Sequence, residues 1–77
     1  MQVKNTYSTV DFYLASFLKA RGLKIVNVKK ENGRSVFIFE DIRERENCVR
    51  DYYNNGLIEV GKFKSALQDL KSIIHNL

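Results

Sequence analysis

An Asn-Gly pair near the middle of the chain constrains the fold more than any other feature. Asn32 and Gly33 separate two runs rich in β-branched and aromatic residues, at residues 24–30 and 34–40. Two-residue hairpin turns favour Asn-Gly because both central residues need a positive φ. The sequence therefore predicts an antiparallel hairpin over residues 24–40.

The turn also sets the register of this hairpin. With a two-residue loop, Glu31 lies opposite Arg34, and the apolar pairs are Val28 with Phe37 and Val26 with Phe39. These two pairs make one apolar face. The opposite face contains Ile25, Asn27, Lys29, Val36, Ile38 and Glu40.

Three residues of the mixed face, Ile25, Val36 and Ile38, are apolar and need cover. One alternative is that a helix of the same chain covers them. The other is that they form a partner surface, since a domain of 77 residues has a limited core and oligomerisation often supplements one. The sequence does not choose between these alternatives.

The first predicted helix precedes the hairpin. Ser8 and Asp11 read as a capping box, with Tyr7 and Phe12 as a hydrophobic staple, and Gly22 suits the position just past the helix end. The apolar stripe of this helix contains Val10, Tyr13, Leu14, Phe17 and Leu18.

Two more helices are expected after the hairpin. Asp41 and Glu44 form a capping box for a highly charged helix that ends near Asn54. The last helix begins near Gly61 or Lys62 and has a clean apolar stripe. Its members are Phe63, Ala66, Leu67, Leu70, Ile73, Ile74 and Leu77. Between these helices, residues 57–60 read as a short edge strand.

These elements predict a single α+β domain over residues 1–77, in the order α-β-β-α-(short β)-α, with helices packed on an antiparallel hairpin. The chain has no proline that would mark a linker. If residues 2–4 also form a strand, the order becomes β-α-β-β-α-β plus a C-terminal helix. That ferredoxin-like order is the alternative fold.

The residues that could carry chemistry do not form a catalytic or metal-binding pattern. Residues 56–62 match the start of a P-loop, but Phe63 stands where a Ser or Thr would hold Mg²⁺. His75 is the only histidine and Cys48 the only cysteine, so neither a metal site nor a nucleophile with its base is indicated. We expect no enzyme, no catalytic residue and no cofactor.

The net charge of +4 arises in the first part of the chain. Residues 1–40 contain seven Lys/Arg and three Asp/Glu, whereas residues 41–77 contain six of each. Four of the cations, Lys24, Lys29, Lys30 and Arg34, belong to the hairpin and are candidate nucleic-acid contacts. The alternative is that they keep the hairpin soluble and protect its edges from aggregation.

The N-terminal residues contain no apolar stretch of the kind found in secretory signals, and no run is long enough to cross a membrane. A cytoplasmic location without membrane association is therefore expected. A single cysteine is also typical of a protein in a reducing compartment.

Four segments of the chain form a further pattern: Tyr7-Ser8-Thr9-x-Asp11-Phe12-Tyr13-Leu14-Ala15, Phe37-x-Phe39-Glu40-Asp41, Asp51-Tyr52-Tyr53-Asn54 and Phe63-Lys64-x-Ala66-Leu67-x-x-Leu70-Lys71. In these segments the chain resembles a family of small bacterial and phage or mobile-element proteins that is described as a domain of unknown function. The resemblance implies a bacterial setting and brings no activity or functional residue. We expect a non-enzymatic protein-interaction or self-associating module. The alternative is a nucleic-acid-associated accessory protein of a phage or mobile element that uses a basic hairpin tip.

Overall fold

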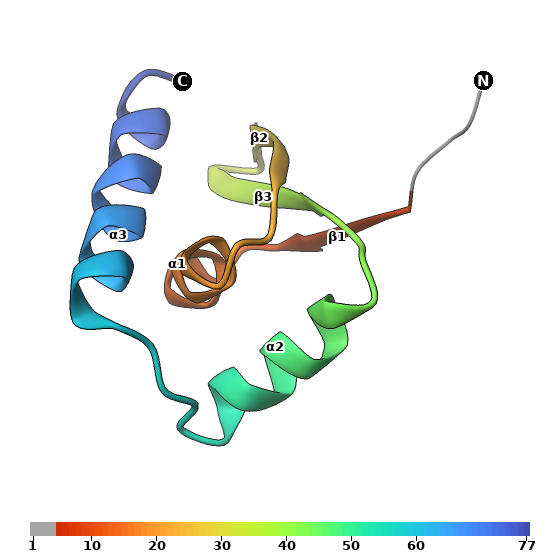
Figure 1. The fold of residues 1–77 in the computed structure, drawn as a ribbon. Coiled ribbons are helices and arrows are strands. Elements are labelled where there is room, and N and C mark those ends of the chain that lie inside the picture. The colour runs from red at the N-terminus through yellow and green to blue at the C-terminus, as the bar shows by residue number, and fades with distance from the viewer. Residues whose placement is uncertain (1–4) are drawn as a thin grey trace.

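The computed structural model describes residues 5–77 as a three-stranded antiparallel sheet with three helices (Figure 1). Along the chain the elements are β1 (Thr6–Thr9), α1 (Phe12–Ala20), β2 (Ile25–Glu31), β3 (Arg34–Glu40), α2 (Glu44–Tyr53) and α3 (Val60–His75). The predicted α+β class is confirmed, and so are the hairpin and the order of the helices.

Helix α1 runs through the middle of the domain, with the sheet, α2 and α3 arranged around it (Figure 1). Its neighbours bury five consecutive residues, Leu14, Ala15, Ser16, Phe17 and Leu18. The hydroxyl of Ser16 donates to the carbonyl of Phe12 at 2.9 Å, which satisfies the one polar side chain among them. Enclosure on several sides therefore replaces the single apolar stripe that the sequence predicted.

The predicted start of α1 is wrong, because Thr6–Thr9 forms strand β1 and pairs with β3. The helix N-cap is Asp11, whose Oδ1 accepts the amides of Tyr13 at 3.0 Å and Leu14 at 3.1 Å. Asp caps a helix as well as Ser does, so Ser8 is available to the strand. Tyr7 then lies opposite Phe39 and is not a helix staple.

The sheet order is β1-β3-β2. Because β1 and β2 both run antiparallel to β3, they are parallel to each other and α1 connects them, which is a split β-α-β arrangement. The fourth strand of the alternative fold is missing from residues 5–77, and residues 2–4 lie outside the described part. The edge strand expected at residues 57–60 is wrong: this segment pairs with no strand, and Val60 opens α3.

The hairpin register is confirmed near the turn and shifts further along. Asn32 and Gly33 have φ values of 52° and 78°, as a two-residue turn of this kind requires. Glu31 pairs with Arg34, and Val28 pairs with Phe37.

A β-bulge between Ile25 and Asn27 then changes the register. Ile25 lies opposite Phe39, so Val26 and Asn27 both face the single residue Ile38. Ile25 consequently packs against the core, and Val26 is 50% exposed. The predicted placement of Val26 inside and Ile25 outside is therefore wrong, because one extra residue exchanges the two faces of a strand.

The core lies between the inner side of the sheet and the helices. Phe37 and Phe39 of β3 contact a cluster to which α1 contributes most, α3 adds Leu70, and α2 adds Cys48. None of the helices in residues 5–77 is both long and apolar enough to cross a bilayer.

Candidate functional site

The outer side of the sheet is the first candidate surface. Phe37 and Phe39 belong to the same buried cluster as Leu14 and Leu18 of α1. Helices α2 and α3 also make their main contacts with α1. Within residues 5–77, no helix therefore covers the opposite side. Strands β2 and β3 place Val26, Asn27, Lys29, Val36 and Ile38 there.

This outer face combines an apolar centre with charged ends. Val36 and Ile38 are half-buried by their neighbours, and Val26 is 50% exposed. Along β3 the side chains on this side begin with Arg34 beside the turn and finish with Glu40. Of the predicted partner surface, Val36 and Ile38 are on this face, whereas Ile25 is on the core side and Val26 takes its place.

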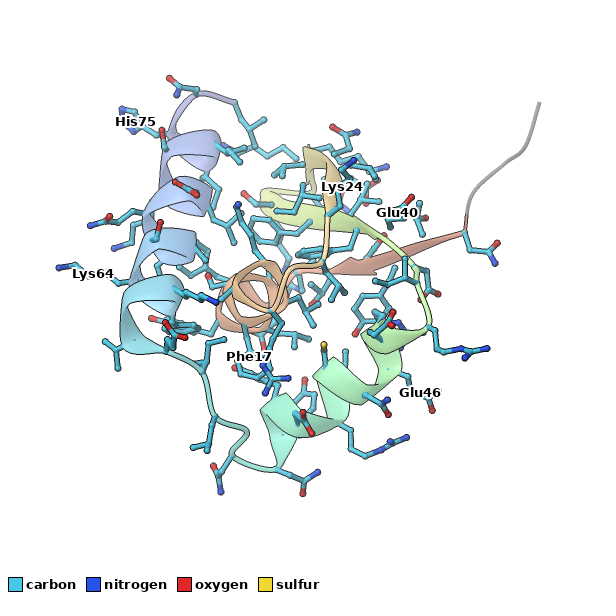
Figure 2. All side chains as sticks on the ribbon, in the orientation of Figure 1. Phe17, Lys24, Glu40, Glu46, Lys64 and His75 are labelled. Carbon is cyan, nitrogen blue, oxygen red and sulfur yellow. The ribbon has the colours of Figure 1, made fainter. Side chains whose placement is uncertain are left out.

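The structure separates the four hairpin cations that the sequence grouped together. The Lys29 Nζ lies 3.0 Å from Glu31 Oε2 and is ion-paired. Lys24 is at the end of the hairpin away from the turn, where its carbonyl accepts the amide of Glu40 at 2.9 Å. Figure 2 shows Lys24 beside Glu40. Lys30 and Arg34 alone remain as cations beside the turn without an ion pair in the described chain.

Sequence reasoning missed a second group of basic side chains, on the exposed face of α3. Lys64, Lys71 and His75 are all exposed and follow one another at i, i+7 and i+11, with Gln68 between them. Figure 2 shows Lys64 and His75 on the side of α3 that faces away from the domain. The signal was available in the sequence, because these positions are complementary to the apolar stripe of the same helix.

The start of β3 and Ile74 of α3 border the same hollow. This hollow of about 440 Å³ is lined by Val10, Phe12, Arg34, Ser35, Phe37 and Ile74. Lys30 pairs with Ser35 and is on the helix side of the sheet, since its side chain alternates with Lys29 on the outer side. Lys30 is therefore on the side of the sheet where Ser35 and Ile74 line this hollow.

The P-loop-like segment serves as the connection between α2 and α3. The Gly56 amide donates to the Asp51 carbonyl, and a Cβ on Gly56 would come within 2.8 Å of that oxygen. The Arg21 guanidinium donates to Asp51 Oδ2 at 3.1 Å and to the Leu57 carbonyl at 2.9 Å. The close packing of Gly56 against Asp51 therefore explains why a glycine occupies this position, and no phosphate site is needed to explain it.

A second hollow, of about 580 Å³, adjoins this connection. Its lining residues are Ala20, Arg21, Leu57, Ile58, Glu59 and Lys62. Leu57 is 89% exposed and the nearby Val60 is 82% exposed. Lys62 Nζ lies 3.9 Å from Glu59 Oε2, so the cations of this hollow have partners within the chain. Leu57 and Val60 thus form a second exposed apolar area, separate from the outer face of the sheet.

Three other titratable side chains, those of Cys48, Tyr52 and Arg45, pack against or bond to other residues of the fold. Cys48 is buried in the core. Burial raises the pKa of Tyr52, whose ring packs 5.5 Å from that of Phe17. A hydrogen bond to Asp41 raises the pKa of Arg45, whose guanidinium also lies 4.4 Å above the ring of Tyr7. Across residues 5–77 no cluster of three His, Cys, Asp or Glu side chains could hold a metal ion.

Comparison with known proteins identifies one family. Residues 4–76 match the model of a family described as "Domain of unknown function (DUF5659)". The match covers nearly the whole chain. No curated protein and no solved structure matches the chain.

Proposed function

The chain belongs to the family with that description, and we propose that it is a non-enzymatic interaction module that self-associates through the outer face of its sheet. The open side of the sheet carries the proposal. Val26, Val36 and Ile38 are on it, and the helices of the described chain pack on the other side.

Burial energetics favours covering this face. A domain of this size buries a smaller share of its surface than a larger one, so an additional apolar contact contributes strongly to its stability. Val36 and Ile38 are already half-buried at their margins, and a second apolar layer would remove the rest of their surface from water.

The order of side chains along β3 favours a second copy of this chain as the occupant. In a two-fold arrangement with the two β3 strands antiparallel, Val36 of one protomer faces Ile38 of the other. The same operation brings Arg34 of each protomer toward Glu40 of its partner, so the charged ends are complementary.

Sedimentation equilibrium from micromolar to millimolar protein tests this proposal. We expect a concentration-dependent dimer, and Ile38→Lys should weaken it at least tenfold, because a lysine would be buried at the centre of the interface. The matched control is Leu57→Lys, which places the same charge on an apolar residue that is 89% exposed elsewhere. Circular dichroism checks that both variants keep the fold.

Two outcomes would reject self-association through this face. One is a wild-type protein that stays monomeric up to the highest concentration. The other is a dimer that Leu57→Lys dissociates and Ile38→Lys leaves intact, which would assign the interface to the connection between α2 and α3.

The proposal includes a cellular setting. We place the protein in the cytoplasm of a bacterium, encoded by a phage or other mobile element, on the basis of the resemblance and of the single, buried Cys48. Fractionation of a bacterial host that expresses the tagged chain would test the location.

A further inference from the structure

We propose that the exposed face of α3, together with the hairpin turn beside it, binds the phosphodiester backbone of a nucleic acid. We call this the basic surface and define it by Lys30, Lys64, Lys71 and His75. The proposal goes beyond self-association and uses different residues, since Val26, Val36 and Ile38 lie on the outer side of the sheet.

The lysines of the basic surface have no acidic partner within residues 5–77. The ion pairs of this part of the chain engage Lys19, Arg21, Lys29, Arg45, Arg50 and Lys62. The one acid of α3, Asp69, lies 3.5 Å from Lys19 Nζ and so faces α1. The positive charge of Lys30, Lys64 and Lys71 therefore remains available to an external anion.

The spacing of these lysines suits an extended polyanion. Lys64 and Lys71 are two helical turns apart, which corresponds to about 10 Å along the axis. A duplex presents about six phosphate charges over that length. Lys30 extends the surface past the end of α3, because its pairing partner Ser35 lines the same hollow as Ile74.

The side chains of the basic surface favour nucleic acid over a protein or a membrane. Lys64, Gln68, Lys71 and His75 include no apolar residue, whereas protein interfaces are anchored by buried aromatic or aliphatic side chains. A helix that binds a membrane surface presents Trp, Phe or Leu to the lipid, and this face has none. Lysine and polar side chains are the groups that contact phosphates in nucleic-acid complexes.

Fluorescence anisotropy with labelled duplex DNA, single-stranded DNA and RNA tests the proposal. With three phosphate-contacting lysines, the plot of log affinity for duplex DNA against log salt should have a slope of about −2.7. Raising the salt fourfold, from about 50 to about 200 mM, should then weaken binding about 40-fold.

Two charge-reversal variants that change the net charge by the same amount identify the binding surface. The test variant is Lys64→Glu/Lys71→Glu. The control is Lys24→Glu/Arg43→Glu, which reverses two cations that also have no ion pair within residues 5–77 and that belong to other parts of the fold. The test variant should bind at least tenfold more weakly at low salt, with its slope reduced to about −0.9. The control should stay within about twofold of the wild type, because salt screens charges outside the interface.

Three results would overturn the proposal. The first is the absence of binding to any of the three nucleic acids at low salt. The second is an equal loss in test and control variants, which would show attraction by net charge alone. The third is displacement of the nucleic acid by polyglutamate at equal charge concentration, which would indicate an acidic protein partner. Ile38→Lys should retain nucleic-acid binding, so failure of self-association and failure of this proposal are distinguishable.

Discussion

Helices α2 and α3 both pack against α1, but they differ in what holds them there and in what they present to solvent. Helix α3 buries Ala66 and Leu70, whereas α2 buries only Cys48. Helix α2 is held in addition by polar and aromatic contacts, such as that of Tyr52 with the ring of Phe17. Helix α3 therefore attaches to α1 mainly through buried apolar side chains, and α2 largely through polar and aromatic side chains.

The charges of the two helices are also distributed differently. In α2, Arg50 pairs with Glu46 at 3.3 Å, and Arg45 pairs with Asp41 at 3.0 Å. In α3, Lys64 and Lys71 have no ion pair within the described chain. Residues 41–59 contain three Lys/Arg and five Asp/Glu, a net charge of −2, and residues 60–77 contain three and one, a net charge of +2. The neutral total for residues 41–77 conceals this segregation.

Replacing one core residue in each helix gives the largest expected difference. Leu70→Ala should lower the free energy of unfolding by about 3 kcal/mol, because Leu70 is fully buried and its truncation leaves a cavity. Cys48→Ala should lower it by about 1 kcal/mol, since one sulfur atom is lost at the margin of the core. Urea denaturation followed by circular dichroism measures both. Equal losses would show that α2 is as deeply anchored as α3.

The glycines that flank the connection between the helices give the next largest contrast. Gly56→Ala should destabilise the protein by about 2 kcal/mol, because the new Cβ meets the backbone oxygen of Asp51 at 2.8 Å. Gly61→Ala is the matched control, with no atom within 4 Å of the new Cβ and a position in the first turn of α3. It should raise stability by about 0.5 kcal/mol through helix propensity. Thermal melts of both variants measure these opposite signs, and a loss in both would contradict them.

Surface cations give the smallest effect. Arg45→Ala should cost about 1 kcal/mol, because it removes both the pair with Asp41 and the contact with the Tyr7 ring. Lys64→Ala should change stability by less than about 0.5 kcal/mol. Denaturation at low and at high salt measures the stability loss caused by Arg45→Ala. The loss should be smaller at high salt but not zero, since the contact of Arg45 with the ring persists there. A larger loss from Lys64→Ala would mean that α3 uses its basic face to stabilise the fold.

The sequence predicted the hairpin well because Asn32 and Gly33 specify a turn with little help from the rest of the chain. The predicted register is wrong at Val26, where a bulge turns Ile25 toward the core and has no local signature in the sequence. The predictions for residues 6–9 and 57–60 were wrong for a related reason, since a short run forms a strand only where another strand lies alongside it. β3 provides such an edge for Thr6–Thr9.

The candidate surfaces were predicted in part for similar reasons. Val36 and Ile38 follow from the alternation of β3, which the bulge does not disturb. The basic surface required knowledge of how the elements pack, because Lys30 and Lys71 are 41 positions apart in the sequence. Lys24 and Lys30 are close together in the sequence, but they lie at opposite ends of the hairpin.

The central position of α1 has a consequence for synthesis on the ribosome. The strands and α1 emerge first, but Leu14 and Leu18 share their cluster with Leu70 of α3. Until residues 60–75 have left the exit tunnel, part of the surface of α1 stays in contact with water. The nascent chain therefore exposes an apolar helix during elongation, which is the kind of surface that chaperones recognise. We expect ribosome profiling of chaperone association to find the chain engaged before α3 emerges and released when α3 packs on α1.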